Sequence, residues 1–338
     1  MEAILSTLNT LLMDLVNPQK RVFFGYLCVA FLIAVFVIYH RSGRKFSVSR
    51  CCRSVLSPKI WFDKSSVADF KLILFNRLIF GGIFLRIFSK SAVGIAVYFF
   101  CLEQTWFPSG MQYKLPTFFP PILFTVVLFI IDDYSRYWTH RLMHMIPALW
   151  ELHKVHHSAT VMTPFTVFRT HPAEALIFST RGALVQGSVV GLCFALFGTE
   201  LSLLTIMGAN AASVIFHAVG SNLRHSHVPF RYPEWLESWL ISPVQHQIHH
   251  SLDPKHYDKN FGVAFACWDR IHGSLCYSDS NKLRFGLSID DKKINLTHGL
   301  VPLLVIPLMN ILKIQRLKPT GARSSELISG DPIKQGLS

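Results

Sequence analysis

Three short clusters of histidine constrain this 338-residue chain more than any other feature of its sequence. The first is His140 with His144 in HRLMH, and the others are HKVHH at residues 153–157 and HQIHH at residues 246–250. In a helix, residues three and four apart lie on one face, so each cluster can turn its imidazoles toward a common point. Any fold of the chain has to bring these groups into a setting that uses them.

Composition indicates a membrane protein rather than two soluble domains. Hydrophobic residues make up 51% of the chain and charged residues only 16%, with a mean hydropathy of +0.36. The net charge of +13 does not indicate nucleic acid, because the Lys and Arg residues are scattered or lie beside apolar runs. We expect no nucleic-acid partner. Seven cysteines without regular spacing favour a reducing, cytosol-facing location.

Apolar runs predict where the chain meets the membrane. The uncharged run from Val22 to Tyr39 has 18 residues, just enough for a helix to cross a hydrocarbon core of about 30 Å. Basic residues are far more frequent after this run than before it, which places residues 40–70 in the cytosol. Residues 71–102 are apolar with basic interruptions, and form either an interfacial helix followed by one span or a single tilted span.

The remaining apolar runs lie on either side of the first two histidine clusters. Thr117–Ile131 predicts a span that ends just before the first cluster, and Ala175–Gly198 with Leu201–His217 predicts a helical hairpin that dips into the bilayer and returns. One crossing at residues 71–102 then puts all three clusters on the cytosolic face. The membrane is either a bacterial inner membrane or the endoplasmic reticulum.

The expected fold is an all-α, multi-span helical bundle with about four to five spans or hairpin arms. A cytosolic helical cap would hold a histidine-rich dinuclear metal centre. We divide the chain into an N-terminal membrane region at 1–115, a catalytic domain at 116–285 that includes the hairpin 175–217, and a segment at 286–338 made of an interfacial segment and a mobile tail.

The histidines themselves predict the metal. Eight imidazoles are too many for one first-row ion and suit two, and neutral imidazole favours zinc, copper, iron or nickel over calcium or magnesium. The chain lacks the HExxH pattern of zinc peptidases and the Glu-x-x-His pattern of soluble di-iron bundles. A dinuclear iron centre is therefore the prediction. Its ligands would be the eight clustered residues His140, His144, His153, His156, His157, His246, His249 and His250.

The clusters and the stretch DPKHYDKNFGVAFACWDRIHGSL that follows the third resemble the fatty acid hydroxylase and sterol desaturase superfamily, over about residues 120 to 280. The resemblance implies an integral membrane enzyme with two iron ions, dioxygen as co-substrate, and a cytochrome b5-like or ferredoxin-like electron donor. It also implies a ninth ligand at His217, in IFHAVGSNL. His171, His225 and His227 stay open as further members of the site.

Ligating imidazoles need partners for their second ring nitrogen. Asp133, Tyr137, Glu174 and Asp269 are the candidates. Their alternative roles are a helix-end charge for Asp133 and an ion pair with Arg270 for Asp269.

Three classes of function fit these features. An oxygen-dependent lipid hydroxylase or desaturase predicts two irons per chain and a lipid product changed by one oxygen or two hydrogens. A metal transporter would place its ligands at mid-membrane in broken helices. A noncatalytic, metal-stabilised lipid-binding protein would keep the ligands and consume no oxygen. The sequence does not distinguish hydroxylation from desaturation, and leaves sterols, fatty acyl chains, ornithine or ether lipids and carotenoids open as substrates. It does not indicate an oligomeric state.

Overall fold

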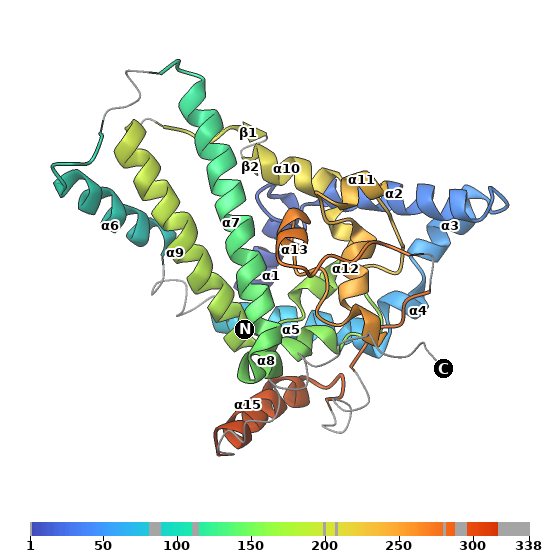
Figure 1. The fold of residues 1–338 in the computed structure, drawn as a ribbon. Helices are drawn as coiled ribbons and strands as arrows, with labels where there is room; N and C mark the ends of the chain where they lie inside the picture. Colours follow the sequence, from blue (N-terminus) through green and yellow to red (C-terminus); the bar gives the residue numbers. More distant parts are fainter. Residues whose placement is uncertain are drawn as a thin grey trace, which may run out of the picture.

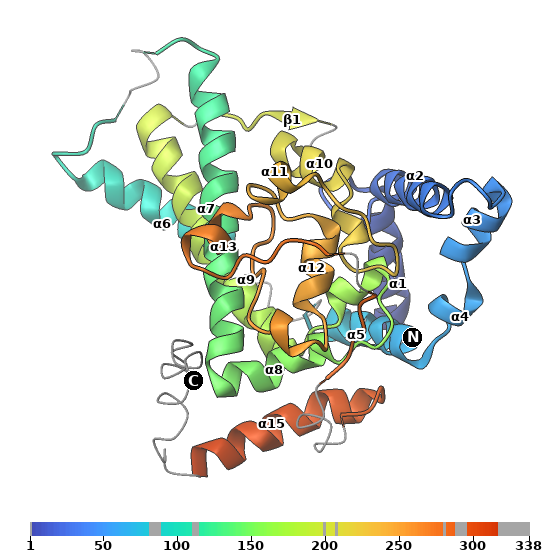
Figure 2. The ribbon, with the colours of Figure 1, turned by 45° about the vertical axis from the view of Figure 1, so that its right-hand side comes forward.

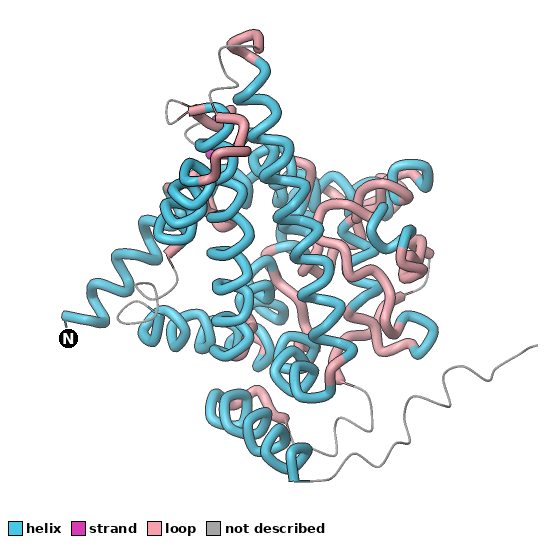
Figure 3. The backbone as a smooth tube through the Cα atoms, turned by 60° about the vertical axis from the view of Figure 1, so that its left-hand side comes forward, coloured by secondary structure: helices cyan, strands magenta, loops and turns pink. Residues whose placement is uncertain are grey.

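The computed structural model describes residues 2–80, 89–109, 115–198, 201–206, 209–279, 282–287 and 296–316. Within these ranges the regular secondary structure consists of helices and one two-stranded antiparallel sheet. In that sheet Thr205 pairs with Asn210 and Ile206 with Ala209. The predicted all-α class is therefore confirmed. Figure 3 shows many of the longer loops on one side of the molecule, where they lie among short helices.

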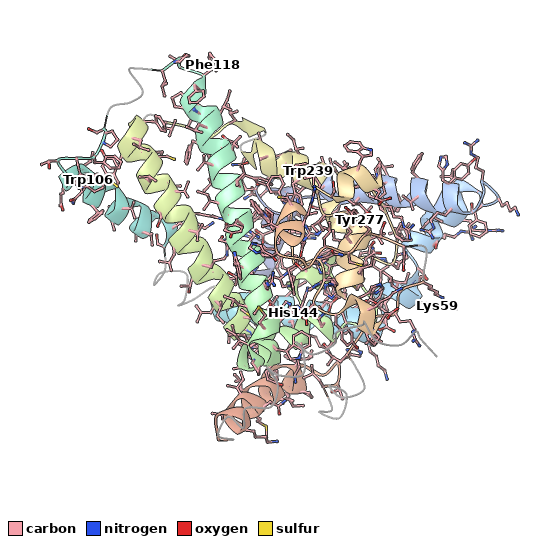
Figure 4. All side chains as sticks on the ribbon, viewed as in Figure 1. Lys59, Trp106, Phe118, His144, Trp239 and Tyr277 are labelled. Carbon is pink, nitrogen blue, oxygen red and sulfur yellow. The ribbon has the colours of Figure 1, made fainter. Side chains whose placement is uncertain are left out.

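Three helices form an arm that projects from the rest of the molecule (Figure 1). They are α6 (Lys90–Glu103), α7 (Phe119–Met145) and α9 (Pro172–Phe197). We call them the helical arm. Its free end carries exposed aromatic side chains, with Trp106 and Phe118 far from His144 at the other end of α7 (Figure 4). An arm with apolar residues on its outer faces suits a lipid environment better than water.

Small residues let α6 and α9 approach closely within the arm. A methyl group added at Gly187 would lie 2.7 Å from the carbonyl oxygen of Lys90, and one added at Gly191 would lie even closer to the carbonyl oxygen of Gly94. Such contacts favour helix association where burial of apolar surface supplies no driving force. The helix that pairs with α9 is therefore α6, which precedes the histidine clusters in sequence.

The other elements form a body beside the base of the arm (Figures 1 and 2). Its N-terminal part contains α1 (Glu2–Val16), α2 (Phe24–Arg41), α3 (Val48–Val55), α4 (Pro58–Trp61) and α5 (Lys64–Phe80). The central part contains α8 (Pro147–His157), η3 (Pro164–Phe168), β1 (Thr205–Ile206), β2 (Ala209–Asn210), α10 (Ala211–Ala218) and η4 (Ser221–Leu223). The last part contains α11 (Glu234–Glu237), α12 (Pro243–His249), η5 (Pro254–His256), α13 (Cys267–Ile271) and α15 (Leu300–Arg316).

Two of the described helices, α2 and α9, are long and apolar enough to cross a membrane. They do not run side by side, because α2 lies crosswise to the arm in Figures 1 and 2. The crossing expected at residues 71–102 falls partly on residues 81–88, outside the described residues. Its described parts are the end of α5 and most of α6, and α6, with 14 residues, is about 21 Å long, short of a full hydrocarbon core.

The second arm of the hairpin expected at residues 175–217 differs from the prediction. After α9 the chain forms the β1–β2 pair, and only α10, with 8 residues, is helical. The Asn210 side chain accepts a hydrogen bond from Ser213 N and starts α10 at residue 211, while Leu204 N donates to Thr125 Oγ1. Extended backbone before a capped helix start explains why an apolar run does not become one long helix. The expected C-terminal interfacial segment contains the helix α15, and the tail from residue 317 lies outside the described residues.

Candidate metal centre

The first two histidine clusters come from a helix and the helix that follows it directly. His140 and His144 lie in the last turns of α7, which ends at the extended residue Ile146. Pro147 then starts α8, where proline lacks only a hydrogen bond that a first helical residue would not make. This break redirects the chain, so that α8 turns its own histidines back toward those of α7.

The third cluster lies on α12, a helix of 7 residues with a well-defined start. Gln245 N donates to Ser242 Oγ at 3.2 Å, and Ser242 N donates to Gln245 Oε1 at 2.9 Å. This reciprocal cap, with Pro243 between the two residues, fixes the first turn of a short helix. His246 and His249 follow within the same helix and His250 caps its end.

The structure gathers nine histidines into two adjacent clusters. In each, the ligating atoms lie within 4.8 Å of one another. The five-histidine cluster contains His140, His144, His153, His157 and His249, and the four-histidine cluster contains His156, His225, His246 and His250. All eight residues of the three sequence clusters are included.

Each histidine doublet divides between the two clusters. His156 belongs to the four-histidine cluster and its neighbour His157 to the five-histidine cluster, while His249 and His250 divide in the opposite order. The rings of His157 and His250 stack with centroids 4.4 Å apart, so the two clusters touch. The HxxHH pattern therefore suits a dinuclear site, because each copy supplies ligands to both positions.

The four-histidine cluster has the geometry of a metal site. The Nε2 atom of His225 lies 3.0 to 3.2 Å from those of His156, His246 and His250, and the last two are 3.3 Å apart. Four nitrogens bound tetrahedrally about 2.1 Å from one metal lie about 3.4 Å from one another. Four neutral imidazoles cannot satisfy all these close contacts as hydrogen bonds, since each ring has one N–H. The donor set therefore fits a metal ion.

Acceptors outside the five-histidine cluster hold its rings so that Nε2 points inward. His140 Nδ1 lies 2.8 Å from Phe261 O, His249 Nδ1 2.8 Å from Lys259 O, and His153 Nδ1 2.7 Å from Glu174 Oε1. The Nε2 atoms of His144, His153, His157 and His249 are buried and have no hydrogen-bond partner in the described part of the chain. Buried nitrogens without partners are costly in a protein, and metal ligation would satisfy them.

The carbonyl that accepts from His249 belongs to a tight turn. Asp258 and Asn260, on either side of Lys259, both adopt φ 57°, a left-handed conformation that Asp and Asn tolerate better than most residues. Asn260 is fully buried, and its side chain donates to Gln245 O and accepts from Cys276 N. The DKN sequence of this turn thus aims a backbone carbonyl at one histidine.

Burial keeps the imidazoles in the form that binds metal. It lowers the pKa of His157 and His250 well below the ordinary value, and neighbouring imidazoles lower it further. Burial likewise lowers the pKa of His249 to about 3. At neutral pH these rings are uncharged, as a metal ligand must be.

Two of the four candidate supporting residues fix the loop that carries Phe261. Asp269 accepts hydrogen bonds from Phe261 N, Gly262 N and Ser274 Oγ, and Asp133 accepts from Ala264 N, Phe265 N and Trp268 Nε1. Neither has its alternative role, because Asp133 lies inside α7 and Asp269 bonds the backbone rather than Arg270. The Tyr137 hydroxyl contacts Ser274 and Arg141, and only Glu174 contacts a clustered histidine directly.

His217, the ninth ligand implied by resemblance, lies outside both clusters in the structure. Its Nδ1 is 2.8 Å from Ser221 Oγ, and its ring packs against Tyr26 at 5.0 Å. His225 takes the ninth position. His171 caps α9 by accepting from Ala173 N, and its Nε2 contacts Leu304 O in α15. His227 lines an apolar cavity and is in neither cluster.

Arg169 supports the second histidine cluster and was not singled out from the sequence. It is fully buried, and its guanidinium donates to Val155 O and Ser158 Oγ at the C-terminal end of α8 and to Asp69 Oδ1 on α5. A buried Arg–Asp pair linking two helices holds the end of α8, where His156 and His157 lie. The RTHP sequence carries no local signal for this role, because Asp69 is a hundred residues away in sequence.

A cavity of about 430 Å³ opens onto both clusters. His144, His157, His249 and His250 line it together with Trp150, Leu252, Tyr257 and Leu287. The cavity therefore places open space directly beside the clusters, while the inward-facing nitrogens themselves stay buried. This arrangement suits a catalytic metal centre better than a closed structural site.

Comparisons with known proteins agree with this site. The fatty acid hydroxylase family profile matches residues 125–274. The chain is 28% identical to alkylglycerol monooxygenase of Danio rerio over 160 residues, which is 47% of this chain and 32% of the relative. It is 29% identical to lathosterol oxidase of Homo sapiens over 162 residues, 46% of this chain and 48% of the relative.

A third relative is C-4 methylsterol oxidase of Schizosaccharomyces pombe, 27% identical over 166 residues, 48% of this chain and 51% of the relative. The chain thus spans about a third to a half of the length of the curated relatives that it matches. No solved structure is significantly similar to it. These relatives are named as oxidases or monooxygenases, and the matched segment includes every histidine of the two clusters. Residues 125–274, which contain both histidine clusters, are therefore similar to the fatty acid hydroxylase family.

Proposed function

We propose that this protein is a membrane-bound, dioxygen-dependent lipid hydroxylase or desaturase with a di-iron centre. The observation that carries the proposal is the pair of adjacent, buried histidine clusters, which suit two first-row metal ions. Iron rather than zinc follows from the family, whose named relatives are oxidases and monooxygenases. Reductive activation of dioxygen for oxidation of a lipid C–H bond is the chemistry that two bound irons would supply.

The protein's own residues would position the lipid and keep water out. The cavity beside His157 and His249 would give dioxygen access to the centre, with Trp150, Leu252 and Leu287 as apolar walls. The carbonyls of Lys259 and Phe261 and the carboxylate of Glu174 would keep the ligand rings from rotating. Precise ligand orientation of this kind is the protein's main contribution at a metal site.

The nine clustered histidines are the proposed ligands, with His225 in the place first given to His217. The catalytic face would lie in the cytosol, where a cytochrome b5-like or ferredoxin-like donor can supply electrons. The exposed apolar faces of the helical arm support its insertion into the bilayer.

Lipid analysis of expressing cells tests the proposal. Cells that make the full chain should contain a lipid changed by one oxygen or two hydrogens, and the purified protein should hold about two irons per chain. His249→Ala should abolish the product, whereas His40→Ala, on α2 outside both clusters, should retain it. Full activity of His249→Ala would sink the site assignment. Two bound metals without oxygen uptake or product would favour a noncatalytic, metal-stabilised protein.

A further inference from the structure

Two arginines lie beside the metal centre without an anionic partner. Arg224 directly precedes His225 and is only 3% exposed, yet none of the ion pairs among the described residues includes it or Arg21. Burying a guanidinium without a counter-charge is costly. By contrast, the fully buried Arg169, which has a structural role, forms an ion pair with Asp69.

The hydrogen bonds of the pair leave most of its donors unused. Arg21 donates from Nε to Asn222 Oδ1 and from Nη2 to Ser221 O, both at 3.0 Å. Arg224 donates from Nη1 to Val263 O, and its buried Nε has no partner among the described residues. Each guanidinium has five N–H donors in a planar fork. Neutral acceptors therefore hold the two side chains in place, and several donors stay free for a ligand.

The surroundings add positive charge rather than cancel it. Burial, followed by the charges of Arg224 and Arg136, lowers the pKa of Arg21 to about 9. At Arg224 the charge of Asp133 offsets part of the effect of burial on the pKa, but the Asp133 oxygens already accept from Ala264 N, Phe265 N and Trp268 Nε1. Two metal ions held by neutral imidazoles would make this region still more positive. An anion is the ligand that such a region attracts.

An apolar cavity between α7 and α10 lies close to Arg224. The guanidinium carbon of Arg224 lies 5.3 Å from the ring centroid of Phe216. Phe216 also lines a cavity of about 330 Å³ between α7 and α10, together with Val126, Phe129 and Tyr232. A ligand with an anionic group at the arginines and an apolar part in this cavity would satisfy both surfaces.

We infer that Arg21 and Arg224 bind the carboxylate or phosphate head group of a lipid substrate whose apolar part lies between α7 and α10. His217 is hydrogen-bonded to Ser221, which precedes Asn222, and would belong to this head-group site rather than to the metal centre. The inference rests on the proposed lipid oxidation only for naming the ligand a substrate. It favours an acidic or phosphate-bearing lipid over a neutral sterol.

Binding by the full chain in nonionic detergent, measured by calorimetry without turnover, tests the inference. The probes are oleate, oleyl phosphate and oleyl alcohol, which share one apolar chain, and inorganic phosphate. Loss of charged hydrogen bonds in Arg21→Gln should weaken oleate and oleyl phosphate about tenfold or more. Oleyl alcohol binding should not change. Arg50→Gln, on the exposed face of α3, is the matched control and should bind all three like the parent protein.

Several outcomes decide the matter. Equal weakening of all three lipids by Arg21→Gln, or of none, would overturn the head-group site. If inorganic phosphate binds as tightly as oleyl phosphate, the arginines bind a free anion, and the proposed lipid head-group site is contradicted. Arg21→Lys, which keeps a charge, should recover part of the selectivity, and unchanged metal content in Arg21→Gln shows that the fold is intact. If the protein binds the acidic lipids selectively but oxidises no lipid, the proposed function is contradicted and the anion site is still supported.

Discussion

At the scale of single residues, the site depends on which nitrogen of each imidazole faces inward. His140, His153 and His249 direct Nε2 into the five-histidine cluster because Nδ1 contacts a carbonyl or carboxylate outside it. The difference between His217 and His225 is of the same kind. His217 turns its Nδ1 to Ser221, whereas His225 points Nε2 at three other imidazoles.

Replacing these two histidines separately tests the ninth ligand. His225→Ala should lower the metal content from two ions per chain toward one, because the four-histidine cluster loses a quarter of its donors. His217→Ala should keep both ions. Elemental analysis after a mild chelator wash measures the difference. The reverse result would restore His217 as the ligand.

Glu174 offers a second test at this scale. Its carboxylate is 1% exposed and holds His153, so Glu174→Ala should weaken metal binding about 10- to 100-fold, as is typical for loss of such a partner. Glu174→Gln keeps an oxygen acceptor and should lose less. Titration of the metal-free protein with ferrous ion gives both affinities. Unchanged affinity in the alanine variant would contradict the positioning role.

At the scale of elements, the site is an intersection of short helices held by buried polar contacts. Arg169 and Asp69 tie α8 to α5, while Asp133 and Asp269 hold the loop from Phe261 to Trp268 against α7. The helical arm uses another device, close approach of α6 and α9 at small residues. Polar contacts dominate around the metal centre, and backbone proximity dominates in the arm.

Alanine substitutions at two glycines of α9 distinguish the effect of this close approach on stability from the effect of helix propensity. A methyl group in Gly191→Ala would collide with the Gly94 carbonyl and lie 2.9 Å from Val97 Cβ, whereas Gly182→Ala meets nothing within 4 Å. Both changes gain about 1 kcal/mol of helix propensity. Overpacking should therefore leave Gly191→Ala about 1–3 kcal/mol less stable than Gly182→Ala. Thermal unfolding in detergent compares them, and equal midpoints would argue against a tight α6–α9 contact.

At the scale of the whole molecule, the arm and the two candidate spans bear on how the protein sits in a bilayer. Helices that cross a membrane are tilted by about 20° on average. Because α2 runs crosswise to the arm, α2 and the arm cannot both lie near the membrane normal (Figure 1). The basic residues after α2 are therefore consistent with a helix that lies at the cytosolic interface as well as with one that crosses the membrane. The number of spans stays a prediction.

Metal removal probes the whole fold, because the two clusters join α7, α8, α12 and the residues after η4. An ion that binds only the native state stabilises it by about 2.7 kcal/mol per site at a hundred times its Kd. Chelation should lower the unfolding temperature, and ferrous ion should restore it. His246→Ala, with one cluster damaged, should show a smaller chelator effect. No shift in the parent protein would mean that the clusters do not stabilise the fold through metal.

The helical class and the eight clustered histidines, which suit two metal ions, can be predicted from the residue pattern. The clusters follow from local periodicity, because residues three and four apart share a helix face wherever the helix lies. Tertiary contacts are needed to divide each doublet between the clusters, to bring His225 rather than His217 into them, and to supply the carbonyls of Lys259 and Phe261. Such contacts depend on the turns at Ile146, Gly220 and Asp258–Asn260, which set how the short elements cross. Spacing along the chain carries no information on that crossing.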